Sequence, residues 1–293
     1  MDMQFFPDRA HLRLRSRWHG MYLHAEEDGV RITLRRRRGT LNEAWVVHHL
    51  ERNGVNYVLL HSAAYGRYLA IVSMEATPAP SSGQGQGARR TCLAVQRLYD
   101  APGQNDVLWQ FRFADDGSDD VVMRNRVYGT WHNYGDERRL MQFIVEAIPP
   151  RAEPPELPPV VWWSVPRQQP PAVPIGGPIR RQRRRVVQAQ PVLRRKIHYV
   201  RADDQGNFSP LVWRMLWFDG RSVLHLRRDL AAELGVGEAN VLDITMCVRA
   251  GSNGRLTPLV IDLPFDEQAM DIVVLATDSP AAEALVHPDV AAP

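Results

Sequence analysis

The sequence predicts a mainly β protein with two folded domains. Three stretches in the first 147 residues repeat one strand, turn and strand unit, and a proline-rich segment follows them. The remaining residues change to a strand pattern interrupted by one amphipathic helix. A chain of 293 residues, of which 44% are hydrophobic, is long and apolar enough for two domains with their own cores.

The repeat is the strongest of these signals. Residues 12–25, 58–71 and 121–134 align without a gap. Each copy opens with aliphatic residues two apart, which share one face of a strand, and continues with a small polar residue, a turn and an aromatic residue. A glycine stands at the same place in each turn, where it permits the positive φ that closes the turn. These glycines are Gly20, Gly66 and Gly129.

Further strand candidates fill the spaces between the copies, and Trp45, Trp109 and Met141 each open the last strand of a repeat. The candidates are residues 30–35, 45–50, 91–98, 108–113 and 140–147. No single repeat can bury its own apolar face, so three repeats of up to four short strands predict a closed all-β architecture. We therefore expect residues 1–147 to form a β-trefoil, with residues 77–90 as an insertion in the second repeat.

A composition break separates the two domains. Residues 148–193 hold 12 of the 22 prolines and have no regular apolar period, which predicts a disordered linker. This linker carries seven arginines and two glutamates, whereas residues 194–293 carry 10 basic and 14 acidic groups. The formal net charge of +3 therefore combines a basic linker with an acidic domain. Residues 281–293 are expected to form a C-terminal tail.

Residues 194–280 predict an α+β domain. The elements, in order, are strands 196–202 and 211–218, a helix at 223–234, and strands 243–248, 256–263 and 270–276. Val223, Leu226 and Leu230 recur at helical spacing, and Gly235 stands where a left-handed cap ends a helix. This order is that of a ubiquitin-like β-grasp domain, and another α+β sandwich of the same size is the alternative.

Several motifs carry a family resemblance. They are the opening LRLRS-x(3)-G-x-YL, a fourth strand that begins with tryptophan, and the C-terminal segments GRSV, DITMCVRAGSNGRLTPLV and MDIVV. With these motifs the chain resembles a plant family of unknown function, whose members pair a β-trefoil similar to those of the actin cross-linking protein fascin with a ubiquitin-like domain. The resemblance implies the fold of nearly the whole chain except the linker. It implies little about activity, because a fascin-like fold does not by itself confer actin binding.

The sequence contains no convincing catalytic or cofactor motif. We found no nucleophile with its base, no paired carboxylates, no metal cluster and no phosphate-binding loop. His48 and His49 are neighbours on a strand candidate and point to opposite faces, so they cannot readily bind one metal. We therefore expect no enzymatic activity and no cofactor.

Two arginine runs are the candidate binding residues. The first is Arg35, Arg36, Arg37 and Arg38; the second is Arg180, Arg181, Arg183, Arg184 and Arg185. A solvated loop is the simpler interpretation of the first run, with a binding patch as the alternative. The second run, in the linker, could contact an acidic polymer or the receptors that recognise nuclear localisation signals.

These observations favour a non-enzymatic adaptor with protein partners, and actin, which is acidic, is the candidate partner suggested by the fascin resemblance. A sugar-binding trefoil is the second interpretation, although the repeated Gln-x-Trp signature of ricin-like lectins is missing. Nucleic-acid or nuclear association through the linker arginines is the third. The N-terminus lacks a secretory signal and no apolar run could span a membrane, so we expect a cytoplasmic or nuclear protein without a membrane partner. Cys92 and Cys247 lack disulfide or zinc spacing and are expected to be reduced.

Overall fold

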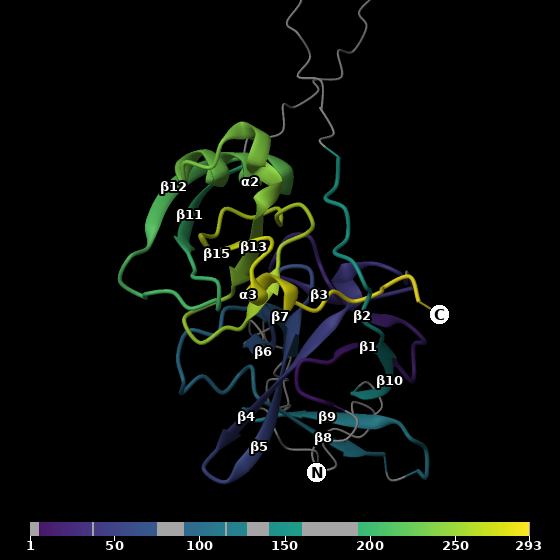
Figure 1. Cartoon of the computed structure of the whole chain (residues 1–293). Coiled ribbons are helices and arrows are strands. Elements are labelled where there is room, and N and C mark those ends of the chain that lie inside the picture. Colours follow the sequence, from purple (N-terminus) through teal and green to yellow (C-terminus); the bar gives the residue numbers. More distant parts are fainter. Residues whose placement is uncertain are drawn as a thin grey trace, which may run out of the picture.

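The computed structural model describes residues 6–36, 38–74, 91–114, 116–127, 141–159 and 193–292. Within these residues the protein is mainly β, with a 10-stranded sheet in its N-terminal half and a 5-stranded sheet in its C-terminal half. The two sheets lie against each other, the first in purple to teal and the second in green to yellow (Figure 1). We call the first the barrel domain, residues 6–148, and the second the C-terminal domain, residues 193–292.

The barrel domain takes its name from six strands that close into a ring. They are β1 (His11–Ser16), β4 (Trp45–Arg52), β5 (Val55–Ser62), β8 (Trp109–Phe113), β9 (Val121–Asn125) and β10 (Gln142–Ile148). β1 pairs with β4, β4 with β5, β5 with β8, β8 with β9 and β9 with β10, and β10 pairs with β1 to complete the circle. Every one of these pairings is antiparallel. A closed ring removes the unpaired edges that an open sheet of this size would expose.

Two hairpins extend from the ring. The hairpin of β2 (Tyr22–Ala25) and β3 (Ile32–Arg35) continues from β1, and the hairpin of β6 (Tyr68–Met74) and β7 (Thr91–Arg97) continues from β5. A short 3-10 helix, η2 (Leu41–Glu43), leads into β4. The two hairpins thus occupy equivalent places in the first and second copies of the predicted repeat.

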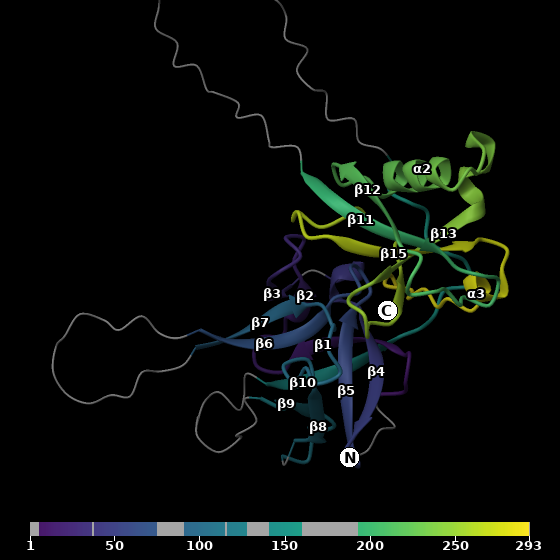
Figure 2. The same cartoon turned by 90° about the vertical axis from the view of Figure 1, so that its left-hand side faces the viewer.

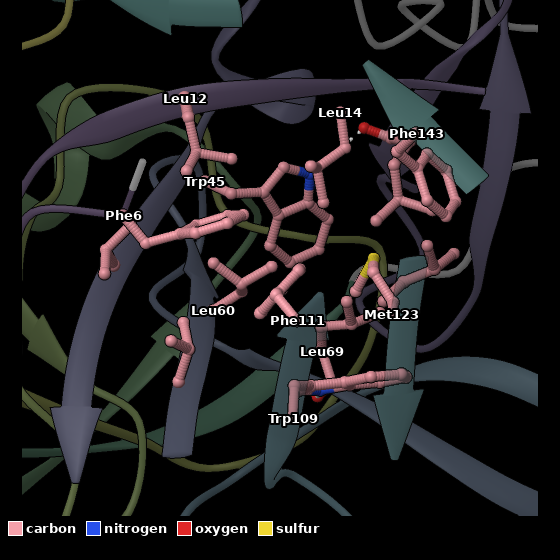
Figure 3. Close-up of a cluster of buried hydrophobic side chains, with 14 of the residues drawn as sticks. Phe6, Leu12, Leu14, Trp45, Leu60, Leu69, Trp109, Phe111, Met123 and Phe143 are labelled. Atoms are coloured by element: carbon pink, nitrogen blue, oxygen red, sulfur yellow. Dashed lines mark hydrogen bonds between the residues drawn. The ribbon is translucent and has the colours of Figure 1, made fainter. Parts of the chain in front are cut away.

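The interior of the ring is filled by the aliphatic residues that the sequence places two apart. Each of the strands β1, β5 and β9 contributes two of them to one buried cluster, several of which are drawn in Figure 3. The six residues are Leu12, Leu14, Val58, Leu60, Val121 and Met123. The indoles of Trp45 and Trp109 are buried among them, and their N–H groups donate to the carbonyls of Leu23 (3.1 Å) and Leu69 (2.8 Å).

The first two repeat turns share the same backbone hydrogen bonds. The amides of Ser16 and Ser62 donate to the carbonyl five residues later, and the amides of Gly20 and Gly66 donate back to the carbonyl four residues earlier, each at 2.8 Å. The two glycines have φ of +62° and +68°. The third copy begins in the same way, because Asn125 lies opposite Trp109 as Ser62 lies opposite Trp45. Its glycine, Gly129, lies outside the described residues.

The C-terminal domain is a mixed sheet in the order β12-β11-β15-β13-β14, with α2 across one face (Figure 2). Its elements are β11 (Arg194–Arg201), β12 (Arg214–Asp219), α2 (Val223–Glu233), η3 (Glu238–Asp243), β13 (Ile244–Arg249), β14 (Leu256–Pro258), β15 (Met270–Ala276) and α3 (Pro280–Glu283). β11 and β15 are parallel neighbours at the centre of the sheet. Leu226 and Leu230 of α2 are fully buried in one cluster with Ile197 and Tyr199 of β11.

Two strands of this domain are shorter than the sequence predicts. The candidate at 256–263 ends at Pro258, beyond which the chain leaves the sheet toward the barrel domain. The candidate at 211–218 begins only at Arg214, because the amide of Val212 donates to Ser209 in a turn. The helix ends as predicted beside Gly235, which has a φ of +72°.

Two matched glycine substitutions separate the cost of the repeat turn from the cost of contact with the C-terminal domain. An added Cβ at Gly20 would meet nothing within 4 Å, whereas at Gly66 it would lie 2.9 Å from Val248 Cγ1. We expect Gly20→Ala to lower the free energy of unfolding by roughly 1 kcal/mol through its positive φ. Gly66→Ala should cost clearly more, because the two domains must also move apart. Urea denaturation of both variants measures the difference, and equal losses would contradict the close packing at Gly66.

Candidate functional site

The first predicted arginine run does not form one free patch. The guanidinium of Arg35 donates to both carboxylate oxygens of Glu26 at 2.7 and 2.8 Å. Hydrogen bonds from Arg35 hold the pKa of the Glu26 carboxyl below its usual range. Arg38 donates to the carbonyl of Ala292 at 3.1 Å, and Arg36 is exposed. Arg37 lies outside the described residues. The run is thus divided between a contact within the barrel domain, from Arg35, and a contact with the C-terminal domain, from Arg38.

The second run lies within residues 160–192, outside the part of the chain that the structure describes. This part includes Arg180, Arg181, Arg183, Arg184 and Arg185. Their binding role therefore stays a prediction from the sequence.

The neighbouring histidines His48 and His49 make separate contacts in the barrel domain. His48 Nδ1 hydrogen bonds with the Tyr68 hydroxyl at 2.9 Å, whereas His49 Nε2 contacts the carbonyl of Phe6. Across the described residues, no group of three or more His, Cys, Asp or Glu side chains could hold a metal ion. No helix among those residues is long and apolar enough to cross a membrane.

The described residues of the two domains make an extensive contact with each other. One part of this contact is the turn between β13 and β14, which forms hydrogen bonds with the backbone of Tyr99. The Tyr99 amide donates to Ala250 and the Asn253 amide donates to Tyr99, both at 2.9 Å. A Cβ at Gly251 would lie 2.6 Å from backbone atoms of Tyr99, so only glycine permits this approach. The AGSNG motif of the sequence thus serves domain docking.

A second part of the contact buries a histidine of the barrel domain. His61 is 2% exposed, and its Nδ1 hydrogen bonds with the Thr257 hydroxyl at 3.0 Å. Nearby, the Arg255 amide donates to the Tyr68 hydroxyl at 3.0 Å, and the Arg255 guanidinium donates to Asp8 at 2.8 Å. Burial lowers the pKa of His61 well below its usual value, so the imidazole is neutral in the folded protein.

The third part is a partly buried aspartate shared by arginines of both domains. Asp266 Oδ2 lies 2.5 Å from Nη1 of Arg67, which follows the barrel strand β5, and Asp266 Oδ1 lies 3.2 Å from Nη1 of Arg195, on β11. Arg67 also donates to the carbonyl of Gly29, and Arg195 donates to the carbonyl of Pro264 at 2.6 Å. We call these three residues the Arg67–Asp266–Arg195 cluster.

The cluster buries more positive than negative charge. Arg67 is 3% exposed and Arg195 fully buried, yet they share a single carboxylate. Burial, together with the neighbouring Arg67, lowers the pKa of the Arg195 guanidinium. Beside the cluster, Arg221 lies over the ring of Phe265 and pairs with Glu27 at 3.3 Å, which adds a further cross-domain contact.

A cleft of about 290 Å³ opens beside this cluster, between the two domains. The barrel domain contributes Tyr65, Arg67 and Leu98 to its walls, and the C-terminal domain contributes Val248, Arg249 and Met270. The cleft is the candidate small-molecule site. Sequence reasoning missed it because Arg67 and Asp266 are isolated residues 199 positions apart, with neither a run nor a periodic pattern to mark them.

The comparison with protein families identifies the C-terminal domain. Residues 193–275 match the family described as the DUF569 associated ubiquitin-like domain. This part of the chain is therefore a ubiquitin-like domain, as the order of its elements predicted. The matched residues leave out the barrel domain. No curated protein matches the chain.

The buried histidines predict that acid destabilises the protein. Burial lowers the pKa of His11 and of His48 from 6.5 to about 4. Below about pH 6.5 these two histidines therefore bind protons in the unfolded chain but stay neutral in the folded chain. The free energy of unfolding thus falls as the pH drops from that value toward 4. Between pH 6.5 and 5, each of these histidines should remove about 2 kcal/mol of the free energy of unfolding.

Urea denaturation at pH 7 and at pH 5 measures this loss. His48→Gln should make the stability less dependent on pH, whereas the control His19→Gln, at an exposed position, should leave the dependence unchanged. Equal stability of the unmodified protein at both pH values would show that the buried imidazoles are not neutral in the folded state.

Proposed function

We propose that the protein is a non-enzymatic binding protein in which a β-trefoil supports a ubiquitin-like domain, and that the edge strand β12 binds an extended acidic segment of a partner protein. The observation that carries the proposal is the exposed tryptophan of β12, Trp217, which lies beside two cationic side chains on a strand that has one described neighbour in the sheet. The part of the partner that binds would be a peptide segment in strand conformation.

The β-trefoil assignment is supported by connectivity. In the first two repeats, the first and fourth strands lie in the closed ring and the second and third form the extending hairpin. The third repeat contributes β9 and β10 to the ring, and residues 128–140 between them lie outside the described part. The equivalent hydrogen bonds of Trp45 and Trp109 also favour a threefold arrangement.

β12 stands at one end of the ubiquitin-like sheet and pairs, among the described strands, with β11 alone (Figure 1). The other side of its backbone thus faces no strand in the described part of the chain. An exposed edge of this kind can receive an added strand from a partner, with backbone hydrogen bonds supplying affinity and side chains supplying specificity.

Exposed apolar residues gather along this edge. Met215 and Trp217, two apart on β12, are 50% and 49% exposed, while Leu216 and Phe218 turn toward α2. Just before the strand, Leu211 and Val212 are 91% and 58% exposed. A contiguous group of large exposed apolar residues costs solvation free energy, and such groups mark interaction surfaces.

The charges beside Trp217 select the partner. The guanidinium of Arg194 lies 4.9 Å from the indole centroid and the ammonium of Lys196 lies 5.3 Å from it. Asp219, 3.6 Å from Arg194, offsets one of these two charges and leaves the edge positive. An acidic strand would therefore be attracted and a basic strand repelled.

Actin remains the candidate partner suggested by the fascin resemblance alone. The internal contacts of Arg35 and Arg38 reduce the charge that the barrel domain could offer to a filament, so the geometry favours the β12 edge as the contact. The sugar-binding and nucleic-acid interpretations gain no support from the described residues.

A peptide-binding measurement tests the edge-strand proposal. We expect the peptide Asp-Val-Glu-Val-Asp-Val-Glu to bind the full-length protein at low salt and to shift the amide NMR signals of β12. Trp217→Ala should weaken binding about tenfold, because aromatic anchors carry much of the energy of such contacts. Trp18→Ala, at an exposed tryptophan of the barrel domain, is the matched control and should bind normally. Equal binding of a peptide with lysine in place of every acidic residue would refute the charge argument.

Co-sedimentation with actin filaments at several salt concentrations tests actin itself. If actin is the partner, the protein should pellet with filaments at low salt, and pelleting should decrease in Trp217→Ala and at higher ionic strength. No pelleting at low salt would remove actin and leave the edge-strand proposal to the peptide measurement.

A further inference from the structure

Several serine and threonine residues of the chain directly precede a proline. They are Thr77, Ser209, Thr257 and Ser279. Thr257 is 2% exposed and its hydroxyl hydrogen bonds with His61, while Ser279 is 3% exposed and is the N-cap residue of α3. Thr77 lies outside the described residues. Among the members of this set that the structure describes, Ser209 alone is exposed to solvent.

The backbone around Ser209 is held by few contacts. Ser209 lies in the loop that joins β11 to β12, where Pro210 is also exposed and has no N–H to bind the rest of the fold (Figure 1). The amide of Leu211 donates to Ser209 Oγ at 3.3 Å, and the amide of Val212 donates to the Ser209 carbonyl at 3.5 Å, both long for hydrogen bonds. A following proline also favours extended backbone at Ser209. An enzyme can therefore reach this serine without opening either domain core.

We propose that Ser209 is a phosphorylation site for proline-directed protein kinases, and that its phosphorylation weakens binding at the β12 edge. The kinase supplies ATP with magnesium. Ser209 Oγ attacks the γ-phosphorus, the bond from that phosphorus to the bridging oxygen of the departing ADP breaks, and the hydroxyl proton passes to the catalytic aspartate of the kinase. The site rests on the exposure of Ser209 and on Pro210, whereas the effect on binding rests on the peptide-binding function proposed above.

The added phosphate reverses the charge of the hairpin of β11 and β12. Without the buried Arg195, which shares Asp266, and with His198 neutral, residues 194–219 carry four cations and three carboxylates, a net charge of +1. These groups are Arg194, Lys196, Arg201, Arg214, Asp203, Asp204 and Asp219. Phosphoserine adds about −1.5 to −2 at pH 7, and residues 202–213 include no lysine or arginine to offset it. The hairpin that attracts an acidic strand thus becomes negative.

The phosphate would also lie near the path of the bound strand. Ser209 precedes Arg214, the first residue of β12, by five positions, and β12 is six residues long. A seven-residue peptide in strand conformation spans roughly 23 Å, so it covers the whole of β12 and one end lies beside the loop. Repulsion between the phosphate and the acidic side chains at that end would weaken binding.

Incubation of the folded full-length protein with magnesium, ATP and a mitogen-activated protein kinase tests the site. Mass spectrometry should find phosphate on Ser209 and none on Thr257 or Ser279, whose side chains are buried. Pro210→Ala keeps the acceptor hydroxyl and should lower the rate of Ser209 phosphorylation at least about tenfold. An unchanged rate in this variant would refute the proline-directed assignment.

A synthetic peptide of residues 203–214 is the matched control for access to the serine. Phosphorylation of this peptide but not of the folded protein would show that the fold hides Ser209. Phosphorylation of neither would show that the kinase does not recognise this sequence. Either result would overturn the proposed site.

Titration with the peptide Asp-Val-Glu-Val-Asp-Val-Glu tests the effect on the β12 edge. At low salt we expect the Ser209-phosphorylated protein to bind about fivefold more weakly than the unmodified protein, with a smaller difference at higher ionic strength. Ser209→Ala treated with the kinase should bind as the unmodified protein does. Equal binding of the phosphorylated and unmodified proteins would refute the regulation. Absence of binding by the unmodified protein would instead refute the peptide-binding function, and the mass spectrometry of Ser209 would be unaffected.

Discussion

Two buried arginines from different domains share one partly buried aspartate, and the relative position of the domains depends on this contact. Burying the guanidinium groups of Arg67 and Arg195 costs several kcal/mol per ion, which only complete geometry can offset. The carbonyls of Gly29 and Pro264 complete that geometry from the barrel domain and the ubiquitin-like domain respectively. Partial docking would leave charges buried without partners, so the two domains are expected to dock fully or separate fully.

The rest of the contact follows from this arrangement. In the docked arrangement, Gly251 lies against the backbone of Tyr99, and the hydroxyl of Thr257 forms a hydrogen bond with His61. These contacts tolerate neither an added methyl group nor an added proton. The same close approach encloses the cleft, so the cleft and the docked interface arise from one set of residues.

The sequence predicted the parts of the fold that depend on local pattern. Leu12, Leu14 and their equivalents lie two apart on their strands, and Gly235 marks the end of α2, so the strands of the barrel and the helix could be predicted from local pattern. It could not predict the interface. Arg67 is a single arginine in a repeat turn and no pattern marks it, whereas the consecutive arginines at 35–38 supply only one contact with the C-terminal domain, from Arg38 to Ala292. Pairing across nearly 200 residues leaves no periodic signal in a single sequence.

The chain also returns to the barrel domain at its far end. Pro288 forms a bridge with Pro150, the amide of Asp289 donates to Pro149 at 2.8 Å, and Arg13 donates to the carbonyl of Val290. The residues that leave the barrel domain therefore lie beside residues that follow the whole ubiquitin-like domain. The separation of the domains is set by these packed surfaces and not by the number of residues that join them. The position of the ubiquitin-like domain is therefore fixed from its C-terminal end as well as through the Arg67–Asp266–Arg195 cluster.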